Sequence, residues 1–124
     1  MSYSKLGILV VCAWLLFLLA VAKDTPRVSF IRPPSFVSDQ DTITLQVRVP
    51  PQAENRVLFV AAYDGDVLVN GSQREMNGAH APALYNLHWR LPAGAISLVA
   101  AIYGAHEDEL ARVTHEMTVL SSGP

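Results

Sequence analysis

The chain has 124 residues, and its nine basic and eleven acidic side chains give a formal net charge of −2. This length accommodates a single domain and excludes a large multidomain enzyme. The weak acidic balance and the lack of a basic stripe argue against nucleic acid as a partner.

The first 22 residues have the composition of a targeting segment. Residues 6–22 carry no charge, follow Lys5 and end with small residues at Ala20 and Ala22. A basic start, an apolar middle and an A-x-A site indicate a secretory signal peptide. An uncleaved membrane tether is the alternative, because these 17 residues are at the short end of the roughly 17–25 that span a bilayer. In both cases residues 23–124 form one exported domain, which is periplasmic, secreted or on the extracytoplasmic face of a membrane.

The exported part is predicted to begin with strands over 27–31 and 42–49. Pro33 and Pro34 end the first strand, since proline cannot continue a strand ladder. In the second strand apolar and polar residues alternate, which is typical of a strand with one buried face. We expect a loop over 35–41 between them.

The middle of the chain is predicted to form a hairpin. Residues 56–63 are apolar at nearly every position, which indicates a strand covered on both faces or one with an adhesive outer face. The sequence DGD at 64–66 is a strong hairpin signal, and residues 67–69 return as a short edge strand. A polar loop is expected over 70–83.

Two further alternating strands are predicted over 85–91 and 95–103, separated by a Pro-Ala-Gly turn. An acidic turn and a closing strand over 112–120 follow. Seven short strands, with no helical periodicity longer than a turn, indicate an all-β, Ig-like antiparallel β-sandwich. In that arrangement one sheet contains strands 27–31, 42–49 and 85–91, and the other contains strands 56–63, 95–103 and 112–120.

This pattern resembles the bacterial Ig-like and fibronectin-III-like domains of exported proteins. The likeness lies in a V-x-F strand before an Asp-Gly turn, a strand with Trp, a P-x-G-x-I-x-L-x-A segment and a final strand of alternating apolar residues. The matching residues are Val57, Phe59, Asp64, Gly65, Trp89, Pro92, Gly94, Ile96, Leu98, Ala100, Val113, Met117 and Val119. All of them are core or turn residues, so the resemblance implies the fold and not a function. The usual Asp-x-x-Gly after the Ala strand is replaced here by Gly-Ala-His-Glu at 104–107.

His115 and Met117 are the candidate metal ligands. They are two residues apart on one strand and therefore share a face, as a soft N/S ligand pair would. The same face carries Val113 and Val119, which favours a core role for Met117 and a satisfied hydrogen-bonding role for His115. A periplasmic copper-binding protein remains an alternative, although without a cysteine in the domain a blue-copper site is excluded. We expect no cofactor.

No nucleophile motif is present in residues 23–124, and the clustered carboxylates fall in turns, where aspartate is expected for backbone reasons. We therefore expect no enzymatic activity. A carbohydrate-binding module is a further alternative, but Trp89 and Tyr85 fall on the buried phase of their strand rather than on a surface that could stack on sugars.

The strongest functional signal is an expected difference between the two sheets. The outer face of the first sheet is polar, with Thr44, Gln46, Arg48, Asn86, His88 and Arg90. The outer face of the second sheet is expected to carry Leu58, Val60, Ala62, Val99, Ala101 and Tyr103. Contiguous exposed apolar area usually marks an interface. We therefore predict a non-catalytic binding or structural module that contacts a protein partner or a second copy through this face, unless loop 70–83 or a terminal segment covers it.

Overall fold

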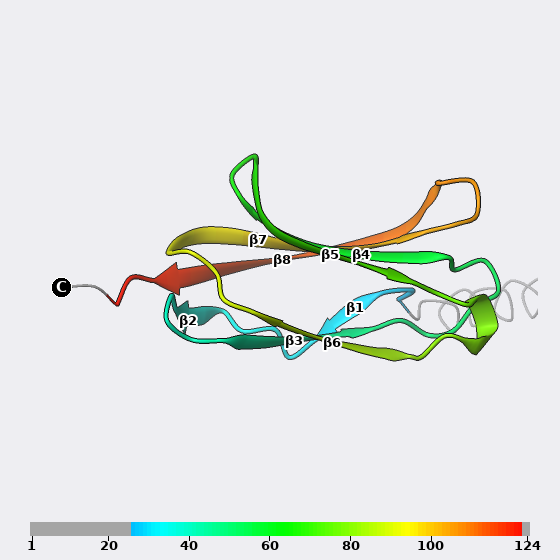
Figure 1. Ribbon diagram of the computed structural model, residues 1–124, viewed down its shortest axis with the longest axis horizontal. Helices are drawn as coiled ribbons and strands as arrows, with labels where there is room; N and C mark the ends of the chain where they lie inside the picture. Colours follow the sequence, from blue (N-terminus) through cyan, green and yellow to red (C-terminus); the bar gives the residue numbers. More distant parts are fainter. Residues whose placement is uncertain (1–25, 123–124) are drawn as a thin grey trace, which may run out of the picture.

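In the computed structural model the described residues, 26–122, form a two-layered β-sandwich (Figure 1). The strands are β1 (Ser29–Ile31), β2 (Phe36–Ser38), β3 (Ile43–Arg48), β4 (Val57–Asp64), β5 (Val67–Glu75), β6 (Leu84–Trp89), β7 (Gly94–Tyr103) and β8 (Glu109–Leu120), and one 3-10 helix, η1, spans Gly78–His80. The targeting segment predicted over 1–22 lies outside the described residues. Within 26–122 no helix has the length and apolar character needed to cross a bilayer.

The two sheets contain the strands that the sequence pattern assigned to them. One sheet has the order β1-β3-β6 and the other has the order β2-β8-β7-β4-β5. Neighbouring strands are antiparallel, except that β2 runs parallel to β8. The predicted grouping of strands is therefore confirmed.

Two segments expected to be loops are strands. Residues 36–38 lie within the predicted loop 35–41 and pair with the end of β8. The predicted loop 70–83 begins as strand, because β5 continues to Glu75 beside β4. The polar composition of 70–75 is compatible with this position, since an edge strand exposes much of its surface to water. The 26–122 region therefore has eight strands rather than seven.

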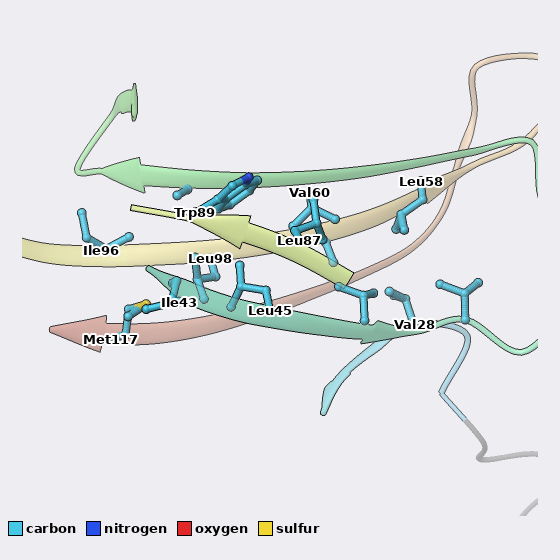
Figure 2. Close-up of a cluster of buried hydrophobic side chains, with 14 of the residues drawn as sticks. Val28, Ile43, Leu45, Leu58, Val60, Leu87, Trp89, Ile96, Leu98 and Met117 are labelled. Atoms are coloured by element: carbon cyan, nitrogen blue, oxygen red, sulfur yellow. The ribbon is translucent and has the colours of Figure 1, made fainter. Parts of the chain in front are cut away.

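The core lies between the two sheets (Figure 2). β3 shows the expected alternation, with every second residue buried and the others exposed. The fully buried large side chains are Leu45, Val47, Val49, Leu58, Val60, Ile96, Leu98 and Ile102, together with Asn55. Each of the aliphatic side chains among them contributes about 1.5–3 kcal/mol by burial.

The chain runs through the sandwich from end to end. It enters the described region at one end of the long axis, before β1, and leaves after β8 at the opposite end, where Figure 1 marks the C-terminus.

Candidate functional site: the outer face of the five-stranded sheet

Strand register decides which side chains share a face of the five-stranded sheet. Between β4 and β7, Val57 lies opposite Tyr103, Phe59 opposite Ala101 and Ala61 opposite Val99. Residues directly opposite each other project to the same side of a sheet. The outer face, meaning the side away from the core, therefore carries Val57, Phe59, Ala61, Tyr63, Ser97, Val99, Ala101 and Tyr103 on its two central strands.

This register corrects half of the predicted face. Leu58, Val60 and Ala62 are fully buried and belong to the core, where they lie opposite Ile102, Ala100 and Leu98. The prediction was wrong by one residue, because a strand without polar residues does not mark which of its two faces is outward. A one-residue slip exchanges the faces completely.

The other three predicted residues do lie on the outer face. Val99 and Tyr103 are half-buried. Ala101 is fully buried but lies outside the core cluster, because larger side chains on the same face surround it. Leu68 of β5 adds a large apolar side chain that is 52% exposed.

The three-stranded sheet presents a different surface. Thr44, Gln46 and Arg48 of β3 are exposed, as are Asn86 and His88 of β6. The Thr44 hydroxyl and the His88 ring form a cross-strand hydrogen bond of 3.1 Å between Oγ1 and Nδ1. The predicted polar character of this sheet is confirmed, so the difference between the two outer faces holds with the corrected set of residues.

The segment 70–75 does not cover the outer face, because it extends the sheet as part of β5. Gly71 lies opposite Ala61, and the side chains of Leu68 and Phe59 both reach the space above it: a Cβ at Gly71 would meet them at 3.8 and 3.9 Å. Leu68 and Phe59 therefore form one apolar surface across β5 and β4, with Gly71 and the buried Ala61 beneath them.

A hollow of about 370 Å³ interrupts this surface at the end of the sheet where β4 begins. It is lined by Val57, Phe59, Gln73, Tyr103, Gly104 and Glu107. Small residues explain the hollow. Ala101 lies beside Phe59, and Gly104 follows Tyr103, so neither neighbour fills the space between the Phe59 and Tyr103 rings. Sequence reasoning identified Tyr103 as a face residue but missed this hollow, which depends on register.

A tight turn after β7 forms one wall of the hollow. The Gly104 amide donates to the Asp108 carbonyl at 2.9 Å, and the Glu107 amide donates to the Gly104 carbonyl at 3.2 Å. Glu107 has φ of 61°, a left-handed conformation that costs a non-glycine residue roughly 1–2 kcal/mol. The turn thus holds the Glu107 backbone in an unusual conformation at the edge of the hollow.

Acidic and basic side chains both lie near the hollow, and the basic ones already have partners. Glu75 lies opposite Val57 on the outer face of β5. Arg112, on the outer face of β8, is already paired with Glu109, whose Oε1 lies 2.7 Å from its Nη2. This carboxylate raises the pKa of Arg112. Arg56 donates from Nη1 to the carbonyls of Ala53 and Asn55.

The predicted metal ligands do not form a site. Nε2 of His115 donates to the Pro34 carbonyl at 2.9 Å, and the ring lies 6.4 Å, centroid to centroid, from that of Phe30. Met117 is 4% exposed and packs in the core. Among residues 26–122, no group of three His, Cys, Asp or Glu side chains is arranged to hold a metal ion. The structure therefore does not favour the copper-binding alternative.

The aromatic residues considered for sugar stacking are directed inward. Trp89 is 8% exposed and belongs to the core. Tyr85 is half-buried, and its hydroxyl is buried without a hydrogen-bond partner in the described region. Burial raises the pKa of the Tyr85 phenol above its ordinary value.

Comparison with known proteins identifies the fold. No known protein family matches the sequence, and no curated protein matches it. The structure is similar to a solved structure of Clostridium thermocellum CbhA fibronectin(III)-like modules, with a TM-score of 0.51 and 13% sequence identity. The aligned region covers 77% of this chain and 99% of that chain. This agrees with the all-β, two-sheet architecture. The chain therefore folds as a fibronectin-III-like, Ig-like β-sandwich.

Proposed function

We propose that this chain is an exported, non-catalytic module that binds a protein partner through the outer face of its five-stranded sheet. The observation that carries the proposal is the apolar surface formed by Phe59, Leu68 and Val99, on a sheet whose counterpart in the same sandwich is polar. A sheet face open to water normally alternates with polar side chains, and an apolar patch on it marks an interface.

Charge favours a basic partner over a second copy of the chain. The outer face carries Glu75 from β5 and Glu116 from β8, with Glu107 and Glu109 at one end, and Arg112 is the basic residue among them. In a symmetric dimer the same patch meets itself, so these carboxylates would oppose one another. A positively charged surface would instead complement them and speed association.

Export is the second part of the proposal. The uncharged residues 6–22 after Lys5 would direct the chain across a membrane, as a cleaved signal or a retained tether. The end-to-end path of the chain supports a spacer-like role, in which attachment at one end of the sandwich leaves the sheet face accessible.

The test compares the tagged wild-type chain with two variants in the producing cells. Val99→Lys places a positive charge on the outer face, and Thr44→Lys places the same charge on the polar sheet as a matched control. We expect a partner with a basic surface to co-purify with the wild type and with Thr44→Lys and to be lost with Val99→Lys. Equal recovery with all three chains, or with none, would contradict the proposal. Cell fractionation and intact mass test export, since a full-length chain in the cytoplasm would exclude it.

A further inference from the structure

We propose that the hollow beside Tyr103 binds an arginine side chain of the partner. This inference rests on the proposed function and names the chemistry by which one end of the outer face would recognise its partner. The hollow combines two aromatic rings, an amide and a carboxylate: Phe59, Tyr103, Gln73 and Glu107.

The two aromatic residues are close enough to act together. Val57 pairs with Tyr103, and Phe59 is two residues further along the same face of β4, so the two rings are diagonal neighbours across adjacent strands. Such pairs are about 7–8 Å apart and within reach of aromatic side chains. Both rings line the same hollow. Aromatic rings attract cations, and a planar guanidinium also stacks on them.

The carboxylates make a cation the preferred occupant. Glu107 lines the hollow, and Glu75 lies opposite Val57, which also lines it. The nearby cations of this chain have partners of their own. Arg112 lies beside Tyr103 and pairs with Glu109, and Arg56 donates to backbone carbonyls. Arg74 lies opposite the core residue Leu58 and so on the other side of β5. Among residues 26–122, neither Glu107 nor Glu75 forms an ion pair.

The turn that carries Glu107 supports the assignment independently. Positive φ is uncommon for residues other than glycine, asparagine and aspartate, and such strain clusters at functional sites. A glycine would adopt the φ of 61° at position 107 without penalty. The presence of glutamate there is explained if its carboxylate is needed beside the hollow, where it can accept two parallel hydrogen bonds from a guanidinium.

The probe is a short blocked peptide with one arginine, compared with the same peptide containing citrulline, which has the same shape without the charge. Each is titrated into the isotope-labelled full chain, and backbone amide shifts are followed by NMR. We expect the arginine peptide to shift the amides of residues 104–108 and 57–59 and to bind about three- to ten-fold more tightly than the citrulline peptide. Equal affinity of the two peptides would overturn the proposal.

Variants distinguish arginine binding in the hollow from a general effect of net charge. Glu107→Gln removes the carboxylate and keeps the size of the side chain, and Glu107→Asn does so with a residue that tolerates positive φ. Asp66→Asn, in the hairpin turn at the other end of β4, changes the net charge equally and serves as control. We expect either change at 107 to abolish the preference for arginine and the control to preserve it.

Two other results would refute the inference, and a third would refute the proposed function alone. A neutral hexasaccharide that binds the hollow equally well in wild type and Glu107→Gln would assign the rings to sugar stacking instead. If the peptides do not bind but Val99→Lys still eliminates partner recovery, the outer face is the binding surface and the hollow does not take arginine. If the arginine peptide binds but Val99→Lys has no effect on recovery, the hollow is a cation site and the proposed function fails.

Discussion

The corrected orientation of β4 predicts different changes in stability for two matched substitutions. Val60→Thr and Val99→Thr both exchange a methyl for a hydroxyl with almost no change of shape and keep a β-branched side chain in a strand. Val60 is fully buried in a cluster of apolar side chains, so its threonine hydroxyl would lose water without gaining a partner, at a cost of about 1–3 kcal/mol. Val99 is half-exposed on the outer face, and we expect a change within about 0.5 kcal/mol there.

Urea unfolding measures this difference. With Trp14 replaced by Phe in every variant, Trp89 is the only tryptophan and reports on the core. For a slope of roughly 1–1.5 kcal/mol per molar urea, Val60→Thr should lower the unfolding midpoint by about 0.7–3 M, and Val99→Thr should leave it nearly unchanged. Equal shifts, or a larger shift for Val99→Thr, would refute the assignment of these residues to opposite faces.

Further substitutions test other parts of the structure. Gly78→Ala should destabilise the domain by about 1–2 kcal/mol, because Gly78 has φ of 52° and a Cβ would lie 2.9 Å from the Ala53 carbonyl oxygen. Gly71→Ala, with contacts of 3.8–3.9 Å, should be neutral or stabilising in the same urea assay. Tyr85→Phe should be neutral or stabilising by up to about 1 kcal/mol, because it removes a buried hydroxyl without a partner. Burial raises the pKa of Tyr85, so the folded state holds this proton longer, and stability should fall as pH rises above 10 in wild type but less in Tyr85→Phe. Hydrogen bonds that Ser122 donates lower the pKa of Asp39 below 3.8. The contact between Asp39 and Ser122 should persist while Asp39 is ionised and be lost as pH falls through its lowered pKa. The chemical shift of the Ser122 amide would report this loss.

The sequence predicted the sandwich well where polar residues mark the outer face of a strand. In β3, Thr44, Gln46 and Arg48 separate the buried residues, so strand and orientation follow directly from the alternation. β4 has no such markers, and both of its faces are apolar. Its orientation is set by the pairing with β7, which is a property of the folded chain and not of the local pattern.

The hollow and the extra strands depend on contacts between distant segments. β2 is three residues long and is held by its pairing with the end of β8. No local sequence signal predicts this pairing. The polar end of β5 is held by hydrogen bonding to β4 rather than by burial of its own side chains. The hollow brings together residues of β4, β5, β7 and the turn after β7, so its composition could not be predicted before the register was known.

The most direct test of the proposed binding face is photo-cross-linking in the producing cells. A photoreactive residue replaces Val99 on the outer face in one chain and His88 on the polar sheet in another. We expect a discrete adduct with one basic protein from position 99 and none from position 88. Adding the Phe59→Lys substitution should eliminate the adduct from position 99. Adducts of equal yield from both positions, or an adduct from position 88 alone, would contradict the assignment of the outer face as the binding surface.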